Sequence, residues 1–239
     1  MSFIFAGHFA KMGVISLFPY MCLVLEKGMS REGRPVCFAG LASLIGLAVY
    51  TPHLQMLYYA LWGIGFYFLF KLFVLHKAGS AIRLLAGRSL LFTAAVVLGL
   101  GLGSEGLWPS YFYSKGESKR AGGETGKTPE EQLEFARSWS LHPEEVGSLI
   151  LPQWGGFTDP QSGQNYYWGR NAMKLNSEYF GISVLLLALI AVAHIRWRPR
   201  SADAGSGDGD HSLDVSSHAL FMLFLFLFAL AYALGPHTP

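Results

Sequence analysis

Six stretches of mostly apolar residues alternate with polar connections along the chain. Their approximate bounds are 10–26, 36–51, 53–75, 89–108, 179–197 and 218–235. A helix needs about 20 predominantly apolar residues to cross a hydrocarbon core of roughly 30 Å, so each stretch is a candidate span. The pattern therefore predicts an all-α fold, a polytopic transmembrane helical bundle of about six spans. The second and third spans, separated by Pro52, are expected to form a tight hairpin.

Positively charged residues follow every second span. Connections rich in Lys and Arg near the ends of membrane helices face the cytoplasm. These residues are Lys27, Arg31, Arg34, Lys77, Arg83, Arg88, Arg196, Arg198 and Arg200. We therefore predict that both ends of the chain and the long connection 109–178 are extracytoplasmic. Lys71, near the cytoplasmic end of the third span, is expected to extend its amine to the membrane surface.

The spans divide the chain into three parts. Residues 1–108 hold four transmembrane helices, 109–178 form the extracytoplasmic loop, and 179–239 hold the last two spans with a flexible cytoplasmic linker near 198–217. The loop is expected to contain short helices near 129–138 and 143–150. At the first of them, "TPEE" predicts that Thr128 and Glu131 form a capping box.

The stretch "AGGETGKT", residues 121–128, satisfies a loose phosphate-loop pattern. A working phosphate loop follows a buried strand and opens a helix. The residues before 121 are polar and broken by glycine, and the loop is predicted to be extracytoplasmic, so no ATP binding is expected. "GLGLGSEG", residues 99–106, ends an apolar span and is interpreted as small residues that allow close helix packing rather than as a dinucleotide site.

Composition excludes several other classes of function. Only 14% of the residues are charged and the net charge is +2, so no nucleic-acid partner is expected. Cys22 and Cys37 are interpreted as small apolar residues of the spans. Asp208 and Asp210 lack the glycine that an EF-hand loop requires, and no metal site is predicted. Membrane lipids are the expected surroundings.

Ionisable and amide side chains gather at the predicted outer ends of different helices. Such groups are costly near the bilayer, which makes them candidates for function. We predict that they line a polar cavity open to the outer face; the alternative is that they only anchor the helices at the interface. The set consists of His8, Lys11, His53, Gln55, Glu105 and Glu178.

The long loop adds aromatic rings next to charged side chains. Aromatic faces beside carboxylates suit a sugar, and an arginine can bind a phosphate through two hydrogen bonds. The alternatives are an aromatic belt at the membrane surface and, for the two glutamates, a simple helix start. The substrate-binding candidates of the loop are His142, Glu144, Glu145, Trp168 and Arg170, accompanied by Trp139, Trp154, Tyr166 and Tyr167.

Four segments carry a resemblance to a known family. "AGHFAK", "YTPHLQMLYYALWGIGFYFLFKL", "WSLHPEE" and "YWGRNAMKLNSEYFG" occur in this order over nearly the whole chain. Together they resemble the YfhO-type multispanning membrane proteins of bacteria. The opening "MSFIFAGHFAK" and the closing "ALGPHTP" look internal to such a protein, so the chain is expected to be a fragment of a longer one.

The resemblance implies the architecture of a GT-C glycosyltransferase in the bacterial cytoplasmic membrane. Such enzymes take a sugar from a polyprenyl-phosphate carrier and deliver it at the outer face. The donor would be the lipid-linked sugar, with no certain cofactor, and a carboxylate would act as general base on the acceptor. In GT-C enzymes that carboxylate lies in the first outer loop, a region with no match in this chain. The catalytic residue is therefore unassigned.

Two other functions are compatible with the same pattern. A polar cavity among helices also suits a transporter or flippase, although no internal repeat supports one. A non-catalytic membrane scaffold with an outer interaction loop is the third hypothesis.

Overall fold

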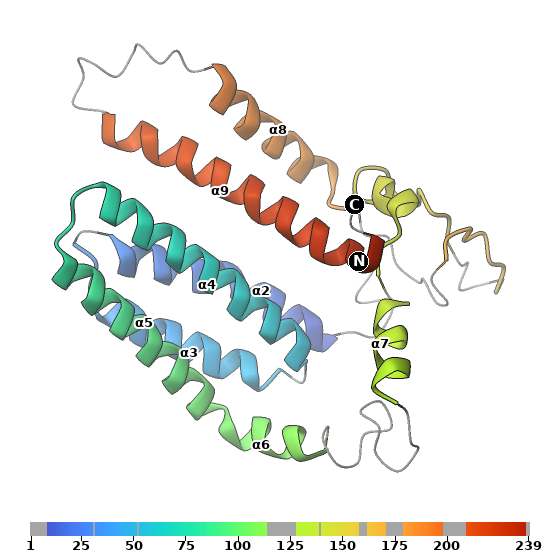
Figure 1. Cartoon of the computed structure of the whole chain (residues 1–239), viewed down its shortest axis with the longest axis horizontal. Coiled ribbons are helices and arrows are strands. Elements are labelled where there is room, and N and C mark those ends of the chain that lie inside the picture. The colour runs from blue at the N-terminus through green and yellow to red at the C-terminus, as the bar shows by residue number, and fades with distance from the viewer. Residues whose placement is uncertain are drawn as a thin grey trace. The chain divides into compact units, whose positions relative to one another are not determined.

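The chain folds into α-helices and short 3-10 helices. A computed structural model describes residues 9–30, 32–51, 53–113, 128–138, 140–157, 162–170, 179–197 and 209–237, and these contain no β-strand. They form two compact units, which meet in sequence between residues 127 and 128. The first unit contains α2 (Phe9–Met29), α3 (Val36–Val49), α4 (Leu54–Lys77), α5 (Ile82–Leu102) and α6 (Ser104–Phe112) (Figure 1). The second contains α7 (Pro129–Arg137), η2 (Pro143–Leu149), α8 (Ile182–Trp197), α9 (Gly209–Leu234) and η4 (Gly235–His237).

Four of these helices are long and apolar enough to cross a membrane. The stretches are Lys11–Met29, Leu54–Lys77, Ile82–Leu102 and Ser217–His237. Two further apolar helices are shorter, and α3, with 14 residues, extends only about 21 Å at 1.5 Å per residue. The prediction of an all-helical fold is confirmed for the described residues, and four helices have the length and composition of membrane spans, whereas six full-length spans are not found.

The fourth span differs from its expected bounds of 89–108. The helix begins at Ile82 and ends at Leu102, and Gly103 separates it from α6. Arg83 and Arg88, expected in a cytoplasmic connection, therefore belong to the helix itself. The helix begins earlier than predicted because Arg88 is buried with hydrogen bonds to the carbonyls of Ser30 and Gly33, so its charge does not end the helix. The end moved because Gly101 and Gly103 weaken helix propensity at that point.

The first unit is packed around α3, which contacts α2 and α5, while α2 also contacts α4. Leu41 and Ile45 of α3 are fully buried. Opposite them, a Cβ atom built on Gly99 would lie 2.7 Å from Cβ of Ile45 and 2.8 Å from the carbonyl oxygen of Ala42. Only glycine lets α5 approach so closely here, which supports the packing interpretation at Gly99, whereas a Cβ on Gly101 or Gly106 would meet no described atom within 4 Å.

In the second unit α8 and α9 lie side by side and are tied to the residues before them. The ring of Phe180 contacts that of Phe226 with centroids 6.0 Å apart, and the Phe180 amide donates to the carbonyl of Leu149 at 3.2 Å. The Leu141 amide donates to the carbonyl of Ala233 at 2.8 Å. The last turn of helix α9 is therefore joined to the segment that follows α7.

The helix starting at residue 129 has the expected cap. The Thr128 amide donates to Oε2 of Glu131 at 3.0 Å, and the Glu131 amide donates to Oγ1 of Thr128 at 3.3 Å. This reciprocal pair is the predicted capping box. The threonine of the Gly-Lys-Thr pattern, Thr128, thus caps the start of helix α7.

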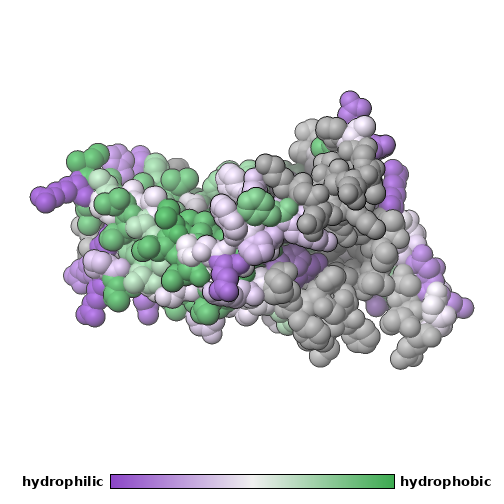
Figure 2. Space-filling model, turned by 90° about the horizontal axis from the view of Figure 1, so that it is seen from below, coloured by the Kyte–Doolittle hydropathy of each residue, from purple (hydrophilic) through white to green (hydrophobic). Residues whose placement is uncertain are grey.

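Large apolar side chains are exposed on many of the described helices, and Figure 2 shows some of them gathered on part of one face. Leu90 of α5 is 72% exposed, and Leu187 of α8 is 67% exposed. Apolar surface of this extent is unusual for a water-soluble monomer and is expected where helices face lipid.

Candidate functional site

The start of one helix and two connections between helices meet at one end of the first unit. A Cβ atom added to Gly13, near the start of α2, would collide with the side chain of Thr51 in the α3–α4 connection. The hydroxyl of Tyr50 in that connection donates to the carbonyl of Leu102, at the end of α5, at 3.2 Å. Figure 1 shows the start of α2, the α3–α4 connection and the α5–α6 junction at this same end. We call it the polar end.

Four of the residues predicted to share an outer cavity lie at or beside the polar end. Lys11 is in the first turn of α2, His53 caps α4, Gln55 is in its first turn, and Glu105 is in the first turn of α6. The structure thus brings their helix ends together, while Glu105 and Gln55 are exposed. His8 and Glu178, which belong to the same set, lie outside the described residues.

His53 has a defined orientation at the start of α4. Its Nδ1 accepts a hydrogen bond from the Met56 amide at 3.3 Å. A nitrogen that accepts carries no proton, so in the neutral ring the proton is on Nε2. Gln55 is turned along the helix, where its Nε2 donates to the hydroxyl of Tyr59 at 3.1 Å.

The opposite end of the first unit contains a charged cluster that the sequence analysis did not identify. Nζ of Lys71 on α4 lies 2.8 Å from Oε1 of Glu26 on α2, and the hydroxyl of Tyr67 donates to Oε2 of the same carboxylate. Lys71 is only 6% exposed. The expectation that its amine reaches the membrane surface is wrong, because Glu26 provides a closer partner inside the bundle. The sequence did contain a signal for this cluster, because Glu26 and Lys71 are ionisable residues within two apolar stretches.

Arg88 holds the connection that follows α2. Its Nη2 donates to the carbonyl of Gly33 at 2.6 Å and lies 3.5 Å from the carbonyl of Ser30. Its side chain is buried, and within the described part of the chain its Nε has no hydrogen-bond partner. Arg88 and Lys71 thus fix the end of α2 from two neighbouring helices.

A second group of candidates lies in residues 140–157 and 162–170, which we call the aromatic segment. Glu145 is fully buried at its centre. Oε1 of Glu145 accepts from the hydroxyl of Tyr167 at 2.8 Å and from the Arg170 amide at 3.3 Å. Although Glu145 was a candidate for substrate binding, the structure places its carboxyl group where it joins two parts of the segment and does not reach the surface.

The neighbouring candidates lie on the outside of the aromatic segment. Nε of Arg170 lies 3.0 Å from Oε1 of Glu144, with 72% and 37% of these side chains exposed. The ring of His142 packs against that of His237, with centroids 4.4 Å apart. Trp168 is 54% exposed, and its indole Nε1 donates to the carbonyl of Trp154 at 3.1 Å. Glu144, Trp168 and Arg170 are therefore available to a ligand in the surrounding water or headgroup layer.

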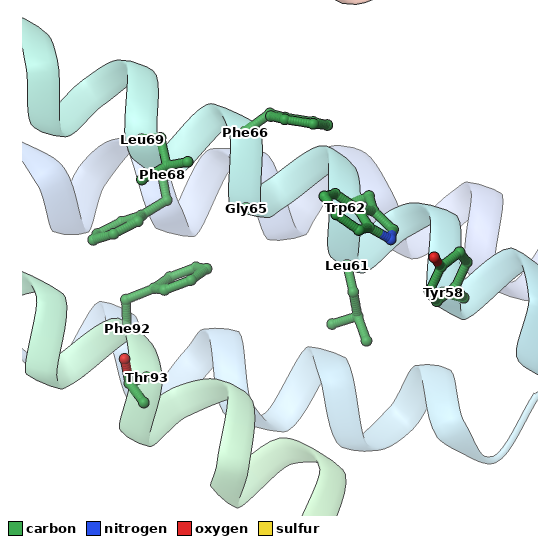
Figure 3. A pocket seen from close by; sticks show the side chains of 9 residues that line it. All are labelled: Tyr58, Leu61, Trp62, Gly65, Phe66, Phe68, Leu69, Phe92 and Thr93. Atoms are coloured by element: carbon green, nitrogen blue, oxygen red, sulfur yellow. The ribbon is translucent and has the colours of Figure 1, made fainter. Parts of the chain in front are cut away.

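An apolar groove of 530 Å³ lies between α4 and α5 in the membrane-spanning region (Figure 3). Phe68 and Phe92 form a stacked pair with ring centroids 4.1 Å apart, and Trp62 and Phe66 line the same groove. Its walls contain no charged side chain. The groove has neither an acid nor a base and does not include any of the predicted site residues.

Comparison of the chain with protein-family models, with curated proteins and with solved structures finds no match.

Proposed function

We propose that this chain is part of a membrane enzyme of the YfhO or GT-C type, which transfers a sugar from a polyprenyl-phosphate carrier at the outer face of the bacterial cytoplasmic membrane. The convergence of ionisable groups at the polar end carries the proposal. Lys11, His53 and Glu105 belong to helices that are far apart in sequence, yet their helix ends meet. A reacting phosphate and sugar need such groups together, at the depth where a lipid-linked donor places its headgroup.

The residues of the polar end suggest a division of roles. The ammonium group of Lys11 and the Nε2–H of His53 are donors for the leaving phosphate, whose charge grows as the glycosidic bond breaks. Glu105 contributes a carboxylate that can bind hydroxyl groups of the sugar. The general base for the acceptor remains unassigned, as the resemblance implies.

Donor binding can be measured with a radiolabelled polyprenyl-phosphate hexose and the full chain reconstituted in lipid nanodiscs. The substitutions Lys11→Ala and His53→Ala are expected to lower donor binding at least tenfold. Lys27→Ala is the matched control, because Lys27 is an exposed lysine in the last turn of the same helix α2. Donor binding that is unchanged in Lys11→Ala and His53→Ala, or lowered equally in all three variants, would contradict a donor site at the polar end.

A transporter or flippase is the second candidate, and the part-buried pair of Glu26 and Lys71 is the observation that favours it. Charged pairs inside membrane helices often mark ion or substrate pathways. The two functions differ in outcome: an enzyme releases polyprenyl phosphate, whereas a flippase moves the labelled lipid between leaflets unchanged. Proteoliposomes loaded with the donor on one side distinguish them.

A further inference from the structure

The indole ring of Trp154 is fixed flat against the backbone of the aromatic segment. A Cβ atom built on Gly147 would lie 2.7 Å from both Cε2 and Nε1 of this ring, so one face of the indole rests directly on the glycine. The indole Nε1 donates to the carbonyl of Glu144 at 2.8 Å. Trp154 is nevertheless 46% exposed. One face is therefore packed on the protein and the other is offered to the surroundings.

The two indole N–H groups of this surface are both used within the segment. Trp154 donates to the carbonyl of Glu144, and Trp168 donates to the carbonyl of Trp154. A tryptophan that anchors a protein at the membrane surface keeps its N–H for water and headgroups. Here the polar atom is satisfied internally. The exposed part of each side chain is an apolar ring in a fixed orientation, which favours stacking with a ligand over anchoring.

The backbone under these rings is held in place by Glu145. Its carboxyl oxygen joins Tyr167 to the Arg170 amide, and Gly155 and Gly169 pass close to that carboxyl group. A side chain at Gly169 would lie 2.5 Å from Oε1 of Glu145. Because the support is closely packed, the rings lose little conformational entropy when a ligand binds.

Hydrogen-bonding groups lie beside the exposed rings. Glu144 and Arg170 form an ion pair at the surface, and the carbonyl of Glu144 is the acceptor that holds the Trp154 indole. A carboxylate accepts hydrogen bonds from hydroxyl groups, and a guanidinium donates to them. An aromatic face with such groups at its edge matches a pyranose ring, which has an apolar C–H face and hydroxyl groups around its rim.

We propose that Trp154, with Trp168, Glu144 and Arg170 beside it, forms a binding site for the hexose units of a carbohydrate chain. The exposed face of the Trp154 indole stacks on one sugar ring, and the ion pair binds the hydroxyl groups at its edge. That this carbohydrate is the acceptor of the transfer reaction rests on the proposed function, whereas the binding itself does not.

The binding is tested with the full chain in nanodiscs and three soluble probes: maltopentaose, cellopentaose and chitopentaose. At least one probe is expected to bind, and Trp154→Ala is expected to weaken that binding at least tenfold by calorimetry. Trp154→Phe keeps an aromatic face without the indole N–H, and it should retain most of the affinity. The matched control is Trp108→Ala on α6, since Trp108 is also an exposed tryptophan, at 68%, but lies outside the segment.

Three results would overturn the proposal. The first is that none of the three probes binds, and the second is that Trp154→Ala binds a probe as tightly as the unchanged chain. The third is that brominated lipids quench the fluorescence of Trp154, identified as the part that is lost in Trp154→Phe, since this shows the ring in the bilayer. Loss of donor binding in Lys11→Ala with unchanged probe binding separates the polar end from this site. Probe binding without any donor binding contradicts the proposed enzyme but supports the carbohydrate site.

Discussion

The ammonium group of Lys71 on α4 and the carboxylate of Glu26 on α2 form an ion pair of 2.8 Å in which the two side chains are unequally exposed, at 8% and 38%. Removing one partner of a buried pair costs about 3–5 kcal/mol when the other charge stays buried. Because Lys71 is the deeper of the two, the loss of its partner leaves the more costly charge behind.

The first prediction follows from this asymmetry. Glu26→Gln is expected to lower the free energy of unfolding by about 3 kcal/mol. Lys71→Met should cost less, because the remaining carboxylate is partly exposed. The double variant should be more stable than Glu26→Gln alone, since it leaves no unpaired ammonium. Denaturation of the detergent-solubilised chain, monitored by circular dichroism, ranks the free energies of unfolding of the three variants. A double variant less stable than both single variants would contradict the prediction.

The ion pair also shows where sequence reasoning reached its limit. Glu26 and Lys71 are 45 residues apart, and each lies near the end of its own apolar stretch. Their pairing depends on how α2 and α4 are rotated about their axes, and hydropathy does not define this rotation. The positions and type of the long helices were predictable, because a stretch of about 20 apolar residues has few alternatives in a membrane.

The candidate site was predictable to a similar extent. His142, Glu144 and Glu145 are close in sequence and were equally suited to bind a substrate. The 3-10 helix η2 separates them: it turns Glu145 into the interior and leaves Glu144 at the surface. Such a difference depends on local backbone geometry within one turn. By contrast, the capping box at Thr128 involves residues three apart, and its spacing alone was sufficient to predict it.

The second prediction compares two glycines of α5. Gly99→Ala is expected to destabilise the protein by about 1–3 kcal/mol, because the new methyl group meets Ile45 and the carbonyl of Ala42. Gly101→Ala is the matched control on the same helix. Among the described residues no neighbouring atom lies within 4 Å of a Cβ there, so the better helix propensity of alanine should stabilise by up to about 1 kcal/mol. Unfolding midpoints of the two variants should therefore shift in opposite directions.

The third prediction concerns the capping box of α7. Thr128→Ala removes the hydroxyl that accepts from the Glu131 amide, and the loss of such a cap costs about 1 kcal/mol. Amide hydrogen exchange in residues 129–137 should become several times faster. Glu130→Ala is the control, because it changes a first-turn glutamate but leaves both capping hydrogen bonds. Equal exchange rates in the two variants would show that the cap does not hold the helix.

The fourth prediction separates the roles of two adjacent glutamates. Glu145→Ala leaves the hydroxyl of Tyr167 and the Arg170 amide without their buried acceptor, which costs about 1–3 kcal/mol for each unsatisfied group. Limited proteolysis should then cleave the aromatic segment. Glu144→Ala removes only an exposed ion pair worth less than about 1 kcal/mol, so the segment should stay resistant.

Both variants are expected to weaken carbohydrate binding, but for different reasons. Glu145→Ala weakens it because the support of Trp154 is lost, and Glu144→Ala weakens it because a hydroxyl acceptor is lost. Protease resistance distinguishes the two causes, and a resistant Glu145→Ala segment would contradict the structural role assigned to this residue.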